Sequence, residues 1–348
     1  MMGSLAVAVC FIGVCGTLSS PDLRGTQTSK RAARAILAQQ TTDGAITMAT
    51  VGKAESSVIP YFGCFAAGGL LDAYHRTKDP EYLLGVRKWV DWYAAHQNPN
   101  GTIYDYKGHS GTWQSTGHYD SSDSYAAVYL TLLREFQSVV PDVNLLKNRR
   151  HSIELAVAGI RLTMQPCGLT IARPDYPVMY TMDNVETLLG LRDAAKLAKT
   201  LGDRELEKDA TAKADRMEAA IDSLFWDESR SAYRAGVQID GGKMQGLAQW
   251  YPDVMANLMA IAWLPSSERN RSLYARLLRQ FGQNIPQHIK SVDDLEKIIW
   301  WAWAAKGVQD RATLLDLQYR LSGFDAICKE GCDAGNLGHI ARLTLQSS

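Results

Sequence analysis

Two kinds of helix alternate along this chain, and this alternation limits the fold more than any other feature of the sequence. Apolar residues recur at three- and four-residue spacing almost throughout, which is the periodicity of α-helices. One set of segments is rich in Ala, Gly, Leu and aromatic residues, which predicts burial on most sides: 57–77, 122–140, 181–201, 248–264, 292–306 and 334–346. The other set carries far more charge, which predicts one wet face: 80–97, 143–165, 204–224, 266–282 and 308–322.

Paired as hairpins, these segments predict an inner ring of helices inside an outer ring. With a further helix at 30–40, the predicted fold class is all-α, an (α/α)6 toroid of six helical hairpins. An α-solenoid is the other way to stack helix pairs, but no repeat of fixed period is visible, which favours the closed ring. Residues 225–233 read as a small β-hairpin insertion around a polar turn.

The first 21 residues differ from the rest of the chain. They carry no charged side chain, and Leu5 to Val14 is almost wholly apolar, which is too short for a comfortable bilayer span. The segment reads as the apolar part of an export signal, although the usual positive start is missing; a membrane anchor and a misassigned start codon are the alternatives. We therefore expect residues 22–348 to form a single toroid domain of an exported protein, secreted or periplasmic. Cys328 and Cys332 could pair in such an oxidising compartment, with free thiols as the alternative.

Charge and motif content exclude several classes of function. The chain has 37 basic and 37 acidic residues and no long basic run, which argues against a nucleic-acid partner. Its seven His are scattered, and no Cys/His cluster marks a metal site. It also lacks a dinucleotide fingerprint, a phosphate-binding loop and a Gly-x-Ser-x-Gly elbow. We expect no cofactor, no metal and a monomer.

Acids and aromatic residues gather where the predicted inner helices begin. In a toroid these helices all start on one face, so residues before and within their first turns should meet there. A long loop at 98–121, before the second inner helix, adds to this face. The candidate residues on this face are Glu55, Tyr61, Tyr104, Asp105, Trp113, Tyr119, Asp120, Asp123, Tyr125, Asp183, Glu186, Trp250, Tyr251 and Asp253.

Helix capping is the structural alternative for many of these acids, because Asp and Glu are common at helix starts. Capping explains Asp120 and Asp123 less well, since two acids three residues apart share a helix face and repel each other. Asp253 leads into an apolar helix, where a buried charge needs a partner or a function.

Acids among aromatic residues suit carbohydrate chemistry. The 9 Trp and 15 Tyr outnumber the 7 Phe, so the aromatic residues combine flat apolar faces with a polar group. Sugars offer apolar ring faces for stacking and hydroxyls for carboxylates. Glycoside hydrolysis needs one carboxyl to protonate the leaving oxygen, and an inverting enzyme needs a second, roughly 6.5–9.5 Å away, to activate water.

Three motifs carry a family resemblance. Glu55-Ser56-Ser57 to Tyr61-Phe62-Gly63 precedes the first inner helix, Asp120-Ser121-Ser122-Asp123 leads into the second, and Trp250-Tyr251-Pro252-Asp253 leads into a later one. In this order they resemble motifs of the six-hairpin glycosidase superfamily, most closely of its family-eight endoglucanases. The motifs depart from that pattern in two extra residues after Glu55 and in the inserted Pro252.

The resemblance implies roles for these residues. It makes Glu55 the general acid and Asp253 the base, while Asp120 and Asp123 hold the sugar at the cleavage point. The strip from Tyr180 to Glu186 is similar to another site strip of the superfamily, so Asp183 is a further candidate.

These observations lead to one hypothesis and two alternatives. The hypothesis is an inverting glycoside hydrolase acting on a polysaccharide or oligosaccharide, with Glu55, Asp253, Asp123 and Asp120 as catalytic residues. The expected substrate-binding residues are Tyr61, Tyr104, Asp105, Trp113, Tyr119, Tyr125, Asp183, Glu186, Trp250 and Tyr251. The alternatives are a toroid that binds glycans without cleaving them and a polysaccharide lyase.

Overall fold

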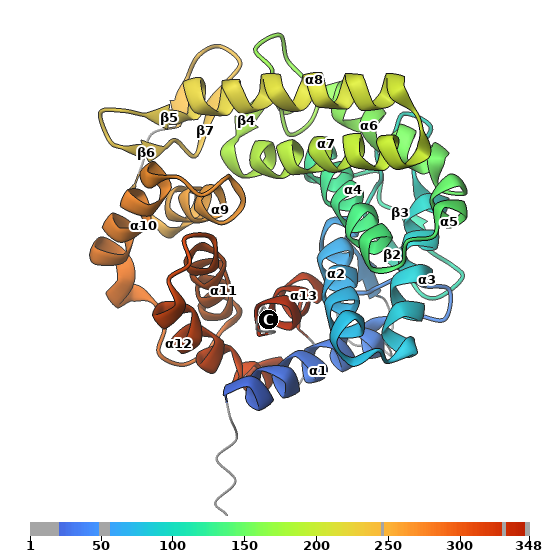
Figure 1. The fold of residues 1–348 in the computed structure, drawn as a ribbon, viewed down its shortest axis with the longest axis horizontal. Coiled ribbons are helices and arrows are strands. Elements are labelled where there is room, and N and C mark those ends of the chain that lie inside the picture. The colour runs from blue at the N-terminus through green and yellow to red at the C-terminus, as the bar shows by residue number, and fades with distance from the viewer. Residues whose placement is uncertain (1–20, 49–55, 245–246, 329–331, 345–348) are drawn as a thin grey trace, which may run out of the picture.

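The protein is a closed ring of paired helices in the computed structural model, which describes residues 21–48, 56–244, 247–328 and 332–344 (Figure 1). Six helices form the inner ring: α2 (Pro60–Thr77), α4 (Ser122–Val139), α7 (Thr181–Leu201), α9 (Met255–Trp263), α11 (Val292–Gly307) and α13 (Ala334–Leu343). Six surround them: α1 (Pro21–Gln39), α3 (Pro80–His96), α6 (Arg150–Thr163), α8 (Arg204–Ala220), α10 (Glu268–Phe281) and α12 (Arg311–Leu321). A short helix, α5 (Val143–Lys147), precedes α6.

Contacts between helices close the ring. Each inner helix packs against the next, from α2 through α4, α7, α9 and α11 to α13, and α13 packs back against α2. Helix α1 covers α13 and α2, so the first outer helix covers the seam between the two ends of the ring. The all-α toroid is therefore confirmed, and the solenoid is not. The inner helices are apolar because they are enclosed: α11 buries nine residues between Leu295 and Ala305.

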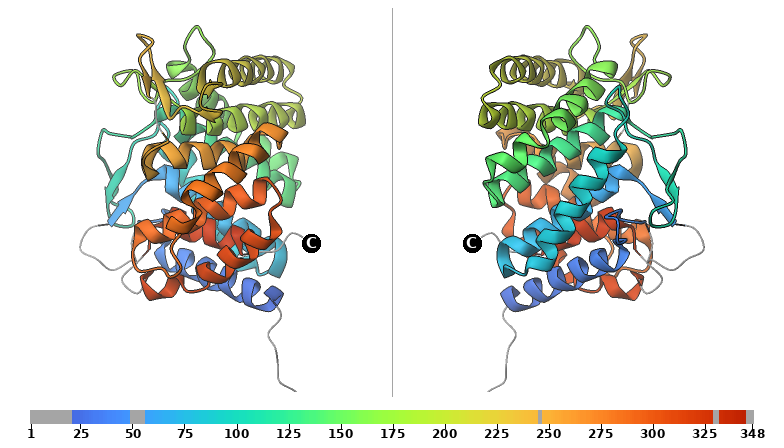
Figure 2. Two further views of the ribbon diagram at one scale, coloured as in Figure 1. Left: turned by 90° about the vertical axis from the view of Figure 1, so that its left-hand side faces the viewer. Right: turned by 90° about the vertical axis from the view of Figure 1, so that its right-hand side faces the viewer.

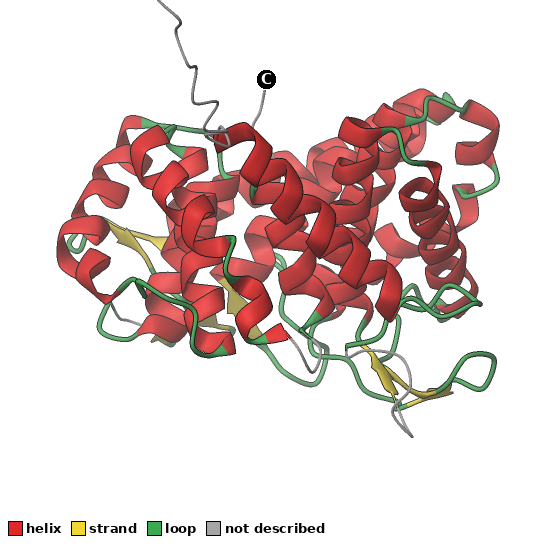
Figure 3. Ribbon diagram, turned by 90° about the horizontal axis from the view of Figure 1, so that it is seen from below, coloured by secondary structure: helices red, strands yellow, loops and turns green. Residues whose placement is uncertain are grey.

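Small strands lie at one opening of the ring. The first sheet joins β1 (Ser56–Val58), β2 (Tyr106–Gly108) and β3 (Gln114–Ser115), and the second joins β4 (Val178–Tyr180), β7 (Gly236–Gln238) and β8 (Lys243–Met244). The predicted hairpin at 225–233 is present as β5 (Trp226–Asp227) paired with β6 (Ala232–Tyr233). Edge-on views place the strands toward the ends where the inner helices begin (Figures 2 and 3). We call that opening the front mouth, and the opening at the carboxyl ends of the inner helices the back mouth.

Local chemistry sets most helix ends where the sequence indicates them. Asp79 accepts the backbone N–H of Glu81, and Pro80 occupies the first position of α3, where a missing N–H costs nothing. Gly202 ends α7 in the left-handed conformation, and Asp203 then caps α8 through the N–H of Leu206.

Three predicted helix boundaries were wrong. The segment 143–165 is two helices, because the chain leaves helical geometry at Arg149 (φ −107°, ψ 4°). Helix α1 begins at Pro21 rather than near residue 30, since its first turns are too polar to show an apolar period. The segment 248–264 begins with a wide irregular turn, Trp250–Val254, before the regular helix α9.

One glycine turn is used three times to join successive outer helices to the inner helices. Gly44, Gly101 and Gly168 follow α1, α3 and α6, all with φ between +87° and +103°. Each donates its N–H to a carbonyl three residues earlier and then lies against the backbone of the next outer helix. A Cβ on each glycine would lie close to a backbone oxygen: Lys88 at 2.5 Å, Leu155 at 2.0 Å and Arg216 at 3.0 Å.

Replacing Gly101 should therefore destabilise the ring. We expect Gly101→Ala to lower the free energy of unfolding by about 3 kcal/mol, from left-handed strain plus the clash with the Leu155 carbonyl. Gly117→Ala is the control, because Gly117 also has a positive φ (+72°) but nothing within 4 Å of its Cβ position. Urea denaturation measures both; equal losses would contradict the packing role.

Two further expectations from the sequence concern the cysteine pair and a membrane span. Cys328 and Cys332 form a disulfide, with Cα atoms 4.7 Å apart. Over the ranges that the structure describes, no helix combines the length and the hydropathy needed to cross a bilayer. Residues 1–20 lie outside those ranges, so the export segment and its boundary stay predictions.

Candidate functional site

Three carboxyl groups lie together at the front mouth, in the first turns of neighbouring inner helices. Asp123 belongs to α4, and Asp183 and Glu186 belong to α7, which packs along α4. The pKa of the Asp183 carboxyl is raised well above its ordinary value, first by burial and then by the charges of Asp123 and Glu186. Acids grouped in this way do not all ionise together, so the group can hold a proton at neutral pH.

Asp123 is fully buried, and only one of its two carboxylate oxygens has hydrogen-bond partners within the part of the chain that the structure describes. Its Oδ1 accepts hydrogen bonds from the Ser121 hydroxyl (2.7 Å) and from the backbone N–H of Ser124 (2.9 Å). Its Oδ2 is buried with no hydrogen-bond partner among the described residues. Burial raises the pKa of Asp123 to about 6, although the hydroxyls of Thr170 and Ser121 and the backbone N–H of Ser124 oppose the rise. The unpaired oxygen leaves one acceptor free for a ligand hydroxyl.

Glu186 links α7 to the first inner helix. Its Oε1 accepts a hydrogen bond of 2.6 Å from the Tyr61 hydroxyl, across 125 residues of sequence. Burial raises the pKa of Glu186 to about 8, so the carboxyl is mostly protonated at neutral pH. A protonated Glu186 can donate a hydrogen bond as well as accept one from Tyr61.

Asp183 is the least constrained of the three carboxyl groups. Its side chain is partly exposed, and within the described chain it makes no hydrogen bond or ion pair, although its backbone carbonyl accepts from Thr187. A carboxyl with a raised pKa, partly exposed at the opening and with no hydrogen-bond or ion-pair partner on another described residue, is suited to give a proton to a bound molecule.

Two further acids lie next to this group. Asp120 is exposed just before α4, and its charge contributes to the raised pKa of Asp183. Asp105 accepts a hydrogen bond of 3.0 Å from the Tyr125 hydroxyl, and burial raises the pKa of Asp105 to about 6. The structure thus brings together five of the acids expected from the sequence.

Tyrosine side chains form the walls of the front mouth. Tyr61 stacks on Tyr125 with ring centroids 5.7 Å apart, and Tyr104 stacks on Tyr119 at 5.8 Å. Tyr251 is 60% exposed, and the charges of Asp183 and Asp120 contribute to its raised pKa, so it lies near both. Flat, partly exposed rings beside carboxyl groups are the arrangement expected for a sugar site.

Four expected site residues have other contacts or lie outside the description. The indole N–H of Trp113 donates to Asp43 (3.0 Å), which ties it to the turn after α1. The ammonium group of Lys297 lies over the Trp250 ring, 6.0 Å from its centroid. Asp253 is buried, and its Oδ2 accepts the N–H groups of Ala248 and Gln249, as a helix cap does. Glu55 lies outside the described residues, so its role stays a prediction.

Sequence reasoning missed two tyrosines and one positioning residue. Tyr176 and Tyr180 stack at 6.3 Å and share a 3.0 Å contact between their hydroxyls, and Tyr251 adds to the raised pKa of Tyr180. Their position just before α7 was a usable signal. The fully buried Asn184 side chain bonds both backbone groups of Thr170 and the carbonyl of Tyr180, which fixes the loop before α7.

The raised pKa of Glu186 predicts a pH-dependent stability. The folded state keeps the proton to about pH 8, while the unfolded chain releases it near its ordinary value of 4.5. The stabilisation is therefore complete below pH 4.5 and is lost as the pH rises to about 8. Glu186→Gln keeps an acceptor for Tyr61 but cannot ionise, so its free energy of unfolding should fall less over this range. Parallel curves for the two proteins in urea titrations at several pH values would contradict the assignment.

Comparison with known proteins supports the fold. No protein family and no curated protein matches the sequence. Among solved structures, the chain is similar to a GH63 mannosylglycerate hydrolase from Thermus thermophilus in complex with glucose. The match has a TM-score of 0.65 and 12% sequence identity, and it covers 91% of this chain and 99% of that one.

Two further glycosidase structures share the architecture. A GH78 rhamnosidase of Bacillus sp. GL1 matches with a TM-score of 0.61 at 13% identity, over 94% of this chain and 35% of that one. A β-1,3-1,4-glucanase from Paenibacillus sp. X4 matches with a TM-score of 0.63 at 10% identity, over 94% and 92%. At these identities the likeness shows the toroid fold alone, and the likeness to family-eight endoglucanases stays a prediction.

Proposed function

We propose that this protein is a glycoside hydrolase that cleaves a polysaccharide or oligosaccharide at the front mouth by an inverting two-carboxyl mechanism. The observation that carries the proposal is Asp183, an unpaired carboxyl with a raised pKa at the opening, beside Asp123 and among exposed tyrosines. The three toroid structures described above are themselves carbohydrate-cleaving enzymes by name, which supports a carbohydrate substrate.

Each acid has a role in this proposal. Asp183 gives its proton to the glycosidic oxygen as the bond from that oxygen to the anomeric carbon breaks. Asp120 takes a proton from water, whose hydroxyl adds to the opposite face of the anomeric carbon, so the products gain one water between them. The free Oδ2 of Asp123 accepts a sugar hydroxyl, and the exposed ring of Tyr251 lines the sugar path.

Asp120 is favoured as the base over Asp253 because of their surroundings. Asp120 is exposed and adjoins Asp183, whereas one oxygen of Asp253 already holds two backbone N–H groups. The pair that the family resemblance implies, Glu55 with Asp253, is the competing assignment. Amide variants distinguish the pair Asp183 and Asp120 from the pair Glu55 and Asp253. The proposal expects Asp120→Asn to lose turnover and Asp253→Asn to lose stability.

We also propose that the enzyme is exported and works as a monomer. The support is the charge-free, apolar start of the chain, which reads as a signal segment. A fusion of residues 1–21 to a reporter that is active only outside the cytoplasm would test export, and gel filtration would test the monomer.

A polysaccharide panel tests the proposed reaction against its alternatives. A hydrolase releases reducing ends without forming a product that absorbs in the ultraviolet. A lyase forms an unsaturated product that absorbs in the ultraviolet. A glycan-binding toroid is retarded on a column of immobilised polysaccharide but releases no reducing ends. Either of the last two outcomes would replace the proposal.

A further inference from the structure

A second cavity lies inside the ring, away from the front mouth. It has a volume of about 270 Å³ and is lined by side chains from α2, α4, α7, α9, α11 and α13. The exposed Lys196 and the partly exposed Arg134 line it from the carboxyl-terminal halves of α7 and α4, so it opens toward the back mouth. Glu186 lines this central cavity and is shared with the site described above, whereas Asp123, Asp183 and Tyr251 do not line it.

A buried histidine supplies a hydrogen-bond donor to the central cavity. His339 is 4% exposed, and its Nδ1 lies 3.1 Å from the indole Nε1 of Trp303. Because an indole N–H can only donate, Nδ1 must accept, and the ring proton is on Nε2. Burial lowers the pKa of His339 to about 3, so the ring is neutral at ordinary pH. Nε2–H has no hydrogen-bond partner among the described residues.

Aromatic rings surround this histidine. Phe65 lies 4.5 Å from the His339 ring and 6.2 Å from Trp263, between centroids. Trp263 and Trp303 both line the cavity, and Trp263 is partly exposed. The cavity therefore offers flat apolar faces next to a fixed N–H donor. Protein cores are close-packed, so an empty space of this kind suits a ligand.

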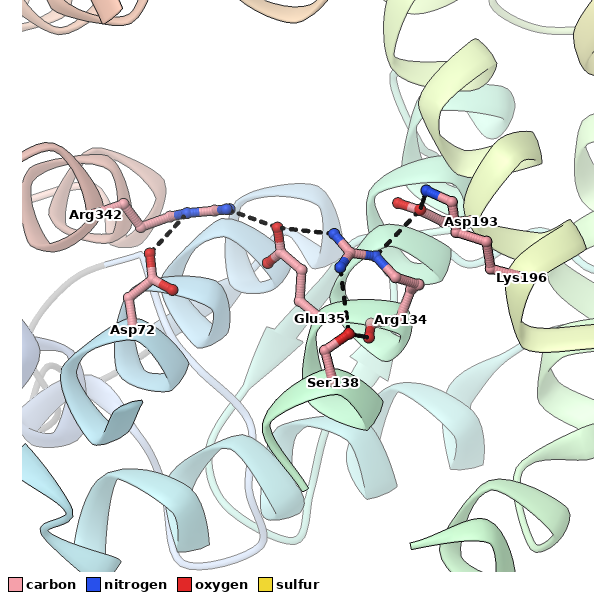
Figure 4. Close-up of polar contacts among 7 residues, drawn as sticks. All are labelled: Asp72, Arg134, Glu135, Ser138, Asp193, Lys196 and Arg342. Carbon is pink, nitrogen blue, oxygen red and sulfur yellow. Dashed lines mark hydrogen bonds and ion pairs between the residues drawn. The ribbon is translucent and has the colours of Figure 1, made fainter. Parts of the chain in front are cut away.

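The charges at the cavity are balanced. Arg342 pairs with Glu135 (2.7 Å) and Asp72 (3.4 Å), while Arg134 and Lys196 both pair with Asp193 (Figure 4). Each cation that lines the cavity is thus already paired with a carboxylate, so none is left unpaired to attract an anion. Oε2 of Glu135 is buried without a hydrogen-bond partner among the described residues, so an acceptor is also free.

We propose that the central cavity binds one neutral monosaccharide, entering from the back mouth. One face of the sugar ring packs on Trp263, one hydroxyl accepts from Nε2–H of His339, and another donates to Oε2 of Glu135. The volume lies just under the roughly 300–1,000 Å³ of drug-sized ligand sites, which suits a single sugar ring rather than an oligosaccharide. An anion would meet the carboxylates, and a hydrocarbon would leave both polar atoms unpaired.

Calorimetric titration of the full chain with D-glucose, D-mannose and D-galactose tests this. We expect one of them to bind at one site per chain with a Kd of about 1 mM, and acetate and toluene to bind more weakly. Thr131→Trp and Leu189→Trp, which fill the cavity from two different helices, should abolish binding. Thr200→Trp, on the exposed surface of α7, should leave it unchanged.

Two further variants separate this proposal from the proposed hydrolase. His339→Phe should weaken sugar binding roughly tenfold through loss of the N–H donor, whereas Tyr251→Ala at the front mouth should not alter it. Four results would overturn the proposal. Sugar binding could persist in both filling variants, or it could disappear in Tyr251→Ala. The cavity could bind acetate or toluene more tightly than sugar, or no sugar could bind at all. The readout is binding alone, so a failure to hydrolyse any glycan leaves it standing.

Discussion

Asp183→Asn should reduce glycan hydrolysis by about 10²–10⁴-fold, because an amide cannot give a proton to the leaving oxygen. The same change should leave the melting temperature unchanged or raise it. It removes a carboxyl that burial and the charges of Asp123, Glu186 and Asp120 disfavour, so repulsion falls when it becomes neutral. Reducing-end release and thermal unfolding measure the two effects on one protein sample.

The control for this variant is Asp175→Asn, the same change at the exposed Asp175, which pairs only with Arg173 at the surface. It should retain nearly full activity. If Asp183→Asn kept full turnover, or lost turnover only in proportion to a loss of folded protein, Asp183 would not be the proton donor.

Arg342→Met should lower the free energy of unfolding by about 2–3 kcal/mol, which lies between the cost of a surface pair and that of a buried pair, because the Asp72 side chain is 39% exposed. Arg342 lies on α13 and joins it to α2 and α4 through Asp72 and Glu135, and it also lies over the Trp303 ring at 5.6 Å. Its removal leaves Asp72 without its ion-pair partner, and leaves Glu135 with only the 3.8 Å pair to Arg134, where the two ends of the ring meet (Figure 4). Urea denaturation gives the magnitude.

Arg161→Met is the matched control for this prediction. Arg161 is half-exposed, and its partner Asp209 remains paired with Lys213, so the cost should stay within about 1 kcal/mol. Adding Asp72→Asn and Glu135→Gln to Arg342→Met should recover part of the loss. Similar costs for the two single variants would show that the Arg342 network does not hold the ring closed.

The sequence was enough to predict the ring but not every helix. The alternation of apolar and charged segments carries the order of inner and outer helices, because burial on all sides requires an all-apolar surface. The turn at Arg149 was invisible because it contains neither Gly nor Pro. Helix α1 was placed too short because polar residues dominate its first ten positions.

The sequence predicts which acids gather at the mouth of the ring, but it does not predict which of them contact each other. Acids at the starts of inner helices must meet at one mouth of a toroid, and this follows from topology alone. Which of them touch depends on contacts between distant segments, such as Tyr61 with Glu186 and Arg342 with Glu135, 207 residues apart. No local period encodes such pairs. The raised pKa of Asp183 likewise depends on burial and on the charge of Asp123 on another helix, so it appears only once the helices have packed.

The most direct test of the account follows hydrolysis by proton NMR, with the wild-type protein and the glycan that the polysaccharide panel selects. The spectrum resolves the anomeric configuration of the first product before it equilibrates in water. The account predicts a hydrolysis product whose configuration is opposite to that of the bond cleaved. A product that retains the configuration would contradict the inverting mechanism, and the absence of cleavage of any glycan would contradict the hydrolase itself.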